Sequence, residues 1–163
     1  MGKLVSIVIG SDSDLPVIES CVSMLKKFEI PFELHIASAH RTPKFLRQII
    51  AKAVRAGVEV FIAGAGGAAH LPGVVASETV LPVIGIPVQT KSLSGLDSLL
   101  SIVQMPGGIP VATVAIGNAG AKNAGILACQ ILAAKYKKYR NALVAHRKEM
   151  EKEVIKKSKK LKN

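Results

Sequence analysis

Short apolar runs alternate with longer amphipathic stretches along most of this 163-residue chain. Small and branched side chains fill the apolar runs, which is typical of a parallel sheet covered by helices on both faces. We therefore expect strands rather than buried helices at these runs. The five expected strands are Leu4–Ile9, Phe32–Ala37, Val58–Ala63, Val83–Ile86 and Val111–Ile116.

The stretches that follow these runs have apolar residues three to four positions apart, which predicts helices. The helix expected at Pro43–Ala56 starts with proline after Thr42, which suits the N-cap position. The other expected helices are one with an apolar face from Ile18 to Phe28, a short one after Pro72, one at Leu96–Gln104 and a long one from about Asn118.

Strand and helix alternate five times, and this order predicts an α/β fold. Right-handed crossovers leave few topologies for such a chain. We expect a three-layer, doubly wound parallel sheet of the flavodoxin-like type, with strand order 2-1-3-4-5. Residues 1–134 would form this α/β catalytic domain.

Residues 135–163 have a different composition. They hold 12 Lys and Arg against 3 Asp and Glu, whereas residues 1–134 hold 10 against 8, so most of the net charge of +11 lies in this segment. Apolar residues recur in it at helical spacing, which predicts a basic amphipathic C-terminal helix whose apolar stripe packs on a neighbouring subunit of a homo-oligomer. The stripe consists of Tyr136, Tyr139, Leu143, Met150, Val154 and Leu161.

The cysteines and the lengths of the apolar runs indicate the cellular compartment in which the protein is expected. Cys21 and Cys129 fall in predicted helices among apolar neighbours, so we expect two inert buried thiols in a reducing compartment. Met1 directly precedes a predicted strand, which leaves no room for a signal peptide, and no apolar stretch is long enough to span a membrane. A cytoplasmic protein without a membrane partner is expected.

Polar and glycine-rich segments follow each predicted strand. In doubly wound sheets the ligand binds at the carboxyl ends of the strands, so these segments predict one composite pocket. The segments are Gly10–Asp14, Ser38–Pro43, Gly64–Gly73, Gln89–Gly95 and Asn118–Asn123.

The first of these segments, Gly10–Asp14, lies before a predicted helix, whose N-terminus offers free N–H groups and a positive dipole end. Ser11 and Ser13 can hydrogen-bond a phosphate there, and Asp14 can accept hydrogen bonds from two ribose hydroxyls. N-capping alone is the structural alternative, since Ser and Asp are good caps.

Two histidines follow two different strands, and this suggests proton-transfer chemistry on a small anionic substrate. His40 can act as a general acid and base, and the neighbouring Arg41 has a planar fork that suits phosphate. His70 ends a loop of Gly and Ala whose N–H groups can approach a ligand closely. Packing at a strand end for His40, and bonding to loop backbone for His70, are the alternatives.

Other classes of protein fit the sequence less well. Gly64–Ala69 matches the dinucleotide fingerprint G-x-G-x-x-A, but Glu78 and Asp97 are at the wrong distance for its acidic residue. The basic C-terminal segment would suit nucleic acid, yet it lacks stacking aromatic side chains. The four histidines have no metal-ligand spacing with cysteines or acids, so no metal is expected.

Four segments resemble the signatures of the PurE family, class I, the N5-carboxyaminoimidazole ribonucleotide mutases. They occur in the order and at the spacing of that family, and the resemblance covers roughly residues 3–134. A C-terminal helix that reaches onto neighbouring subunits also fits the octamers of the family. The segments are Gly10–Asp14, Ser38–Pro43, Gly64–Gly73 and Asp97–Pro106.

The resemblance implies an isomerase of de novo purine (IMP) biosynthesis, which moves a carboxylate from N5 to C4 of the imidazole by decarboxylation and recarboxylation. It implies a ribonucleotide substrate, a homo-octamer, and neither metal nor organic cofactor. The alternative is a direct aminoimidazole ribonucleotide carboxylase that uses CO2. The His-Arg-Thr-Pro and Ala-Ala-His-Leu-Pro-Gly patterns favour the mutase, but some direct carboxylases have mutase-like domains, so the carboxyl donor stays open.

The resemblance also implies roles for single residues. His40 would be the general acid and base, while His70 would orient the substrate or contact its carboxylate. The Gly64–His70 loop would be a wall of the carboxyl-transfer pocket. The expected substrate-binding residues are Ser11, Ser13, Asp14, Ser38, Arg41, Gly66, Gly67 and Ala68.

Overall fold

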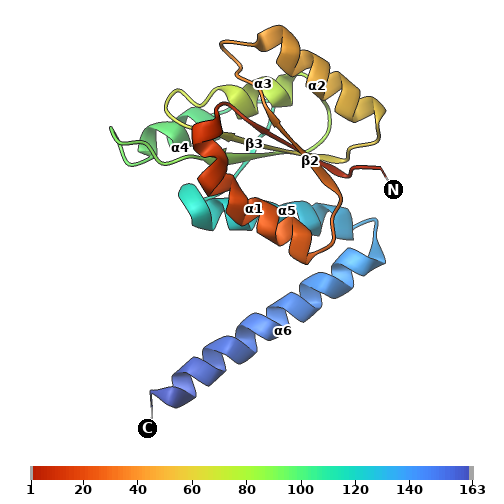
Figure 1. The fold of residues 1–163 in the computed structure, drawn as a ribbon, viewed down its shortest axis with the longest axis vertical. Helices are drawn as coiled ribbons and strands as arrows, with labels where there is room; N and C mark the ends of the chain where they lie inside the picture. Colours follow the sequence, from red (N-terminus) through yellow and green to blue (C-terminus); the bar gives the residue numbers. More distant parts are fainter. Residues whose placement is uncertain (1, 162–163) are drawn as a thin grey trace.

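A five-stranded parallel sheet with helices on both faces organises the computed structural model, which describes residues 2–161 (Figure 1). The strand order is β2-β1-β3-β4-β5, so the predicted flavodoxin-like order is confirmed. Met1 and residues 162–163, which belong to the first and last predicted segments, lie outside the described residues. The strands are β1 (Val5–Ile9), β2 (Phe32–Ile36), β3 (Val60–Ala65), β4 (Val83–Pro87) and β5 (Ala112–Thr113).

The helices cover the sheet in two layers (Figure 1). Helices α1 and α5 pack on one face, and α2, α3 and α4 pack on the other, which confirms the three-layer architecture. No helix among residues 2–161 is long and apolar enough to cross a bilayer. The helices are η1, a 3-10 turn (Asp12–Asp14), α1 (Leu15–Lys27), α2 (Pro43–Arg55), α3 (Leu71–Ser77), α4 (Leu96–Val103), α5 (Gly117–Ala133) and α6 (Lys137–Lys160).

The central strands β1 and β3 are buried along their whole length, as the apolar runs predict. Strand β3 continues two residues beyond its predicted end, so Gly64 belongs to the sheet rather than to the loop. A side chain at Gly64 would stand 2.9 Å from the Ile18 Cδ1 atom of α1. The missing Cβ therefore lets α1 pack closely over the carboxyl end of the sheet.

The fifth strand is present in its predicted place in the sheet but is shorter than the predicted range Val111–Ile116. Only Ala112 and Thr113 pair with β4, because the chain soon turns into α5 at Gly117. The first turn of α5 lies so close to the preceding backbone that a Cβ at Gly120 would overlap the Ala115 carbonyl. The chain therefore leaves the sheet edge after a short pairing.

Two apolar clusters fill the space between the sheet and its helices. Cys21 and Cys129 lie in the cluster under α1 and α5, as free cysteines. Burial raises the pKa of the Cys21 thiol to about 12 and that of Cys129 to about 11. The expected inert, buried thiols are thus present, because a thiol with such a pKa forms almost no thiolate near neutral pH.

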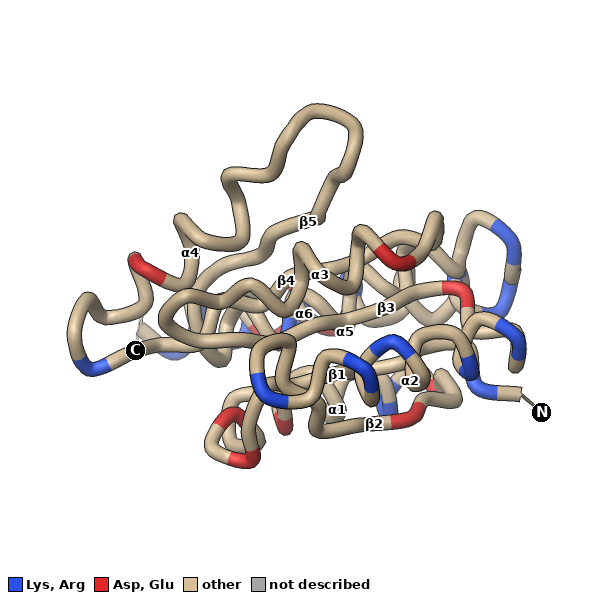
Figure 2. The backbone as a smooth tube through the Cα atoms, turned by 90° about the horizontal axis from the view of Figure 1, so that it is seen from above, with Lys and Arg blue, Asp and Glu red and all other residues tan. Residues whose placement is uncertain are grey.

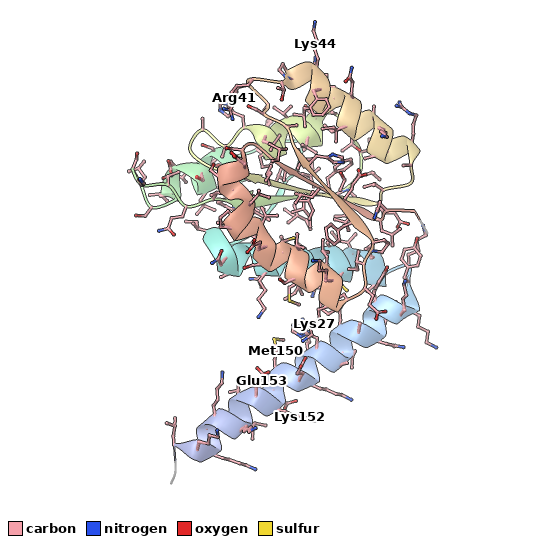
Figure 3. The ribbon with its side chains drawn as sticks, in the orientation of Figure 1. Lys27, Arg41, Lys44, Met150, Lys152 and Glu153 are labelled. Atoms are coloured by element: carbon pink, nitrogen blue, oxygen red, sulfur yellow. The ribbon has the colours of Figure 1, made fainter. Side chains whose placement is uncertain are left out.

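Helix α6 starts on the domain and then extends away from it (Figures 1 and 3). Tyr139 is buried, and the ring of His146 packs edge-on against Phe28 at 5.5 Å between centroids. Farther along, Val154 is 66% exposed and Leu161 is 89% exposed. The first turns of the predicted apolar stripe therefore pack on the same chain, whereas the packing of the distal turns on a neighbouring subunit stays a prediction.

A second exposed apolar surface surrounds α4. Residues 98–121 contain no charged side chain, and Figure 2 shows the loop between α4 and β5 projecting from the body without any charge. We call this surface the α4 face. Its exposed residues are Leu93, Leu96, Leu100, Val103 and Ile109.

Candidate active site

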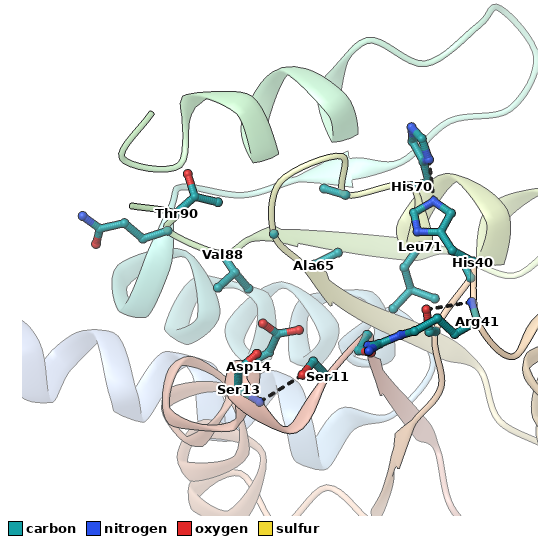
Figure 4. Close-up of a pocket in the computed structure, with 16 residues that line it drawn as sticks. Ser11, Ser13, Asp14, His40, Arg41, Ala65, His70, Leu71, Val88 and Thr90 are labelled. Atoms are coloured by element: carbon teal, nitrogen blue, oxygen red, sulfur yellow. Dashed lines mark hydrogen bonds between the residues drawn. The ribbon is translucent and has the colours of Figure 1, made fainter. Parts of the chain in front are cut away.

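A cavity of about 470 Å³ opens at the carboxyl ends of β1, β2, β3 and β4 (Figure 4). Four of the five polar segments singled out in the sequence contribute to it, whereas Asn118–Asn123 does not line it. The expected composite pocket therefore exists within one chain. Its walls are Gly10, Ser11, Ser13 and Asp14 after β1, Ser38, Ala39, His40 and Arg41 after β2, Ala65, Gly66, Ala69, His70 and Leu71 at the end of β3, and Val88, Gln89 and Thr90 after β4.

The loop after β1 combines a cap with a buried carboxylate. The Ser11 hydroxyl accepts a hydrogen bond from the Ser13 amide at 3.3 Å, so the capping alternative describes part of what Ser11 does. Asp14 lines the cavity and is only 8% exposed. Burial raises the pKa of its carboxyl group, although hydrogen bonds from the Ser11 and Gly10 backbone and from the Ser13 side chain oppose this rise.

The loop after β2 is held by its own side chains. The Ser38 hydroxyl accepts from the Arg41 amide at 3.1 Å, and Thr42 Oγ1 accepts from the Ser38 amide at 2.9 Å. Thr42 occupies the predicted N-cap position of α2, but its hydroxyl makes these loop contacts and bonds to no helix amide. The turn is therefore fixed before any ligand binds.

Arg41 joins two neighbouring loops. Its guanidinium donates to the Gly10 carbonyl at 3.2 Å, which links the loop after β2 to the loop after β1. The guanidinium carries five N–H donors in a planar fork, and this contact uses one terminal nitrogen. Arg41 is exposed and lines the cavity, so its remaining donors are available to an anion.

The two histidines meet at one end of the cavity. His40 Nε2 lies 2.7 Å from His70 Nδ1, and the two rings meet edge-on, with centroids 4.9 Å apart (Figure 4). A contact of this length requires a hydrogen on one nitrogen and a lone pair on the other. The sequence places both residues at strand ends but gives no sign of this direct contact, which makes them one pair that can pass a proton between its members.

The loop from Gly66 to Ala69 turns through the left-handed region of the backbone. Gly67 has φ of 68° and Ala69 has φ of 25°. Gly66 lines the cavity, whereas Gly67 and Ala68 do not, and the Gly67 amide donates to the Ser98 hydroxyl at 3.0 Å instead. Of the three substrate-binding residues expected in this loop, only Gly66 thus faces the cavity of this chain.

The segment after β4 supplies three lining residues, Val88, Gln89 and Thr90, that were not among the expected substrate-binding residues, although Gln89 and Thr90 belong to the predicted segment Gln89–Gly95. The Thr90 hydroxyl contacts both oxygens of the Asp97 carboxylate, at 2.8 and 3.0 Å. The position of these three residues directly after a strand is the sequence signal that could have identified them as lining residues. Among residues 2–161, no group of three or more His, Cys, Asp or Glu is arranged to hold a metal.

Comparison with known proteins gives consistent matches. The sequence model of the family described as AIR carboxylase matches residues 4–153. An N5-carboxyaminoimidazole ribonucleotide mutase of Pyrococcus horikoshii is 57% identical over 158 residues, covering 97% of this chain and 88% of that protein. A protein of the same description from Thermotoga maritima is 56% identical over 157 residues, covering 96% and 91% of the two chains.

A solved structure is also similar throughout. The crystal structure of Treponema denticola PurE superimposes with a TM-score of 0.90 and 28% sequence identity, and the match covers 99% of each chain. The whole described fold, with its long C-terminal helix, is therefore that of a known structural group.

Replacing Asp14 by asparagine should stabilise the ligand-free protein near neutral pH. The folded chain raises the pKa of Asp14 and so holds its proton more tightly than the unfolded chain does. Ionisation of Asp14 therefore opposes folding at a pH above the pKa of the folded state, and asparagine removes this cost. The gain should shrink as the pH falls toward 3.8, the ordinary pKa of the group.

Urea unfolding of both proteins between about pH 4 and pH 8 measures this difference. Asp12→Asn is the matched control, because Asp12 lies in the same turn but is exposed. A lower stability of Asp14→Asn at neutral pH, with Asp12→Asn unchanged, would contradict the effect of burial.

Proposed function

Because this chain belongs to the AIR carboxylase family, we propose that it is an N5-carboxyaminoimidazole ribonucleotide mutase whose active site is the cavity at the ends of β1–β4. The protein is then an isomerase of purine biosynthesis. The observation that carries the assignment of the site is the His40–His70 pair, which stands in one cavity with Arg41 and Asp14.

The reaction moves one carboxylate within one molecule. The bond between the exocyclic nitrogen and its carboxylate breaks, the nitrogen gains a proton, and CO2 and a neutral aminoimidazole result. Ring carbon C4 of this intermediate is nucleophilic, in the manner of an enamine, and it attacks CO2. The proton at C4 then leaves and the ring regains its aromaticity. One proton is taken up and one is released, so the site needs a group that gives a proton and later takes one.

His40 fits both of these steps. In its protonated form the imidazole donates to the departing nitrogen, and in its neutral form it accepts the proton from C4. His70 supports these transfers, because its Nδ1 contacts His40 Nε2 at 2.7 Å and thereby holds the orientation of the His40 ring. The pair returns to its starting protonation state after each turnover, which matches the proton balance of an isomerisation.

The loops after β1 and β2 suit the ribose phosphate part of the substrate. Arg41 offers free guanidinium donors beside the 3-10 turn at Asp12–Asp14, where Ser11 and Ser13 supply hydroxyl groups. The Ser38 hydroxyl lines the same region. The Asp14 carboxylate would repel a phosphate, so we assign it to the ribose hydroxyls, which donate hydrogen bonds to it.

Small residues line the side of the cavity where CO2 must be held. Ala65, Gly66 and Ala69 face the cavity and carry at most a methyl group, so the loop backbone can close around a small molecule. Such a wall excludes water and keeps CO2 near C4. Gly67 and Ala68 then contribute to the substrate site through the shape of this loop.

The direct carboxylase remains the second candidate, because it shares the attack of C4 on CO2 and needs the same wall. We further propose that the protein is cytoplasmic and works as a homo-octamer. The α4 face and the distal turns of α6 support the assembly, because each exposes apolar side chains that a second copy would bury.

The source of the carboxyl group tests the function directly. Substrate labelled with carbon-13 in its N5-carboxylate is incubated with the enzyme in excess unlabelled bicarbonate, without ATP or added metal. A mutase that holds its own CO2 should retain the label in the C4 carboxylate, as followed by NMR. Product with diluted label would identify a carboxylase, and a lack of product would refute the enzymatic assignment.

His40→Asn should lower turnover by at least about a hundredfold, since asparagine cannot give or take the proton. Substrate binding should change little, because Arg41 and Asp14 remain. Steady-state kinetics and a binding titration measure the two effects. His35→Asn is the control, because His35 lies on β2 next to Glu33 and outside the cavity. Near-normal turnover of His40→Asn would remove His40 from the mechanism.

Light scattering on the eluting protein tests the assembly. The octamer predicts a mass of eight times the 17.2 kDa of one chain. A single species at the mass of one chain would contradict both the octamer and the assignment of the exposed apolar surfaces.

A further inference from the structure

Helix α4 lies behind the wall of the cavity and contributes no residue to its lining. Its first turns nevertheless make hydrogen bonds to two segments of this wall, the loop after β3 and the segment after β4. We infer that Ser98 is a positioning residue for the carboxyl transfer, which acts by joining the loop after β3 to the end of β4. This inference rests on the proposed mutase function and assigns a role that the catalytic histidines do not fill.

The Ser98 hydroxyl makes two hydrogen bonds in full burial. It donates to the Val88 carbonyl at 2.7 Å and accepts from the Gly67 amide at 3.0 Å, and the side chain is 0% exposed. Val88 lines the cavity, and its own amide donates to the Ala65 carbonyl at 2.9 Å. One hydroxyl group thus links the loop after β3 to the segment after β4, and the backbone bond of Val88 links that segment back to the end of β3.

The loop needs such an anchor because its shape is not the default of the backbone. Gly67 and Ala69 both have positive φ, and for Ala69 that conformation is unfavourable. The Ala69 amide bonds back to the Gly66 carbonyl at 3.3 Å, which is a weak contact. With Gly67 held by Ser98, the turn points His70 at His40.

Helix α4 is packed firmly on the sheet, so a hydrogen bond to α4 can hold the loop after β3 in place. Ile102 of α4 is buried against β4 at Gly85, where a Cβ would come within 2.5 Å of the Ile102 side chain. Asp97 adds a contact to Thr90 of the cavity. The hydroxyl of Ser98 therefore stands at a defined distance from the strand ends.

Removing the hydroxyl group would leave the part-buried Gly67 N–H and the buried Val88 carbonyl without their partner. The loop would then relax toward water, which loosens both the His40–His70 contact and the enclosure of CO2. Ser98 does not line the cavity, so the effect should fall on turnover and on retention of CO2 rather than on binding.

We therefore expect Ser98→Ala to lower kcat by about 10-fold to 100-fold with KM changed less than about threefold, because small misplacements of reacting groups are costly. The fraction of carbon-13 label retained in the product should also fall, since CO2 escapes before C4 captures it. Ser98→Cys keeps the volume and a weak donor, so its retention should lie between those of Ser98→Ala and the wild type.

Ile102→Val is the matched control, because it loosens the packing of α4 on β4 but leaves the hydroxyl in place. It should retain label as the wild type does, even where its unfolding midpoint drops as far as that of Ser98→Ala. Equal label retention in Ser98→Ala and Ile102→Val would overturn the positioning role.

The wild-type reaction is run beside the variants, so that the test of the mutase function is separate from the test of the role of Ser98. A wild type that retains label, together with a Ser98→Ala that loses it, supports both the mutase and Ser98. A wild type and a Ser98→Ala that retain label equally support the mutase and refute the role of Ser98. A wild type that forms no product refutes the mutase, and with it the inference.

Discussion

The parallel register of strands β1 to β4 is the constraint on which the rest of the structure depends. Ile9 of β1 pairs with Ile36 of β2 and with Gly64 of β3, and Gly64 pairs in turn with Ile86 of β4. The carboxyl ends of β1, β2, β3 and β4 therefore lie within one residue of the same level, and each strand runs into its loop on the same side of the sheet. Loops that are far apart in the sequence therefore meet at the carboxyl ends of the strands. For this reason one short chain can form a cavity lined by four different segments.

At the carboxyl ends of the strands, each loop contributes a different kind of chemical group to the cavity. The loops after β1 and β2 carry groups suited to a phosphate and a ribose. The His40–His70 pair, to which proton transfer is proposed, joins the loops after β2 and β3, and the small lining residues come from the end of β3 and the loop that follows it. Most of the net positive charge of the chain lies on α6, which packs against α1 and α5 on the side of the sheet opposite to α2 (Figures 1 and 2). Under the proposed function, anion binding at the cavity would therefore depend on Arg41 and on the first turn after β1 rather than on net charge.

The sequence predicted those parts of the molecule that depend on local patterns. The apolar runs predicted the strands, and the alternation of strand and helix predicted their order in the sheet. Contacts between loops left no comparable signal, because the direction of a side chain depends on backbone angles such as those of Gly67 and Ala69. For this reason the His40–His70 contact and the bonds of Ser98 appeared only in the structure. The short length of β5 was missed because the apolar run continues to Ile116, whereas the close approach of Gly120 to the Ala115 carbonyl depends on backbone angles that the apolar pattern does not report.

The burial of both cysteines has a practical consequence for spectroscopy. The chain has only two thiols, and at about 12 and about 11 their pKa values leave almost no thiolate to react with a maleimide or a similar reagent. A cysteine introduced on the exposed distal turns of α6, for example at Val154, would be the single reactive thiol of the molecule. A fluorophore attached there would report on the surroundings of this helix without any need to remove the native cysteines first.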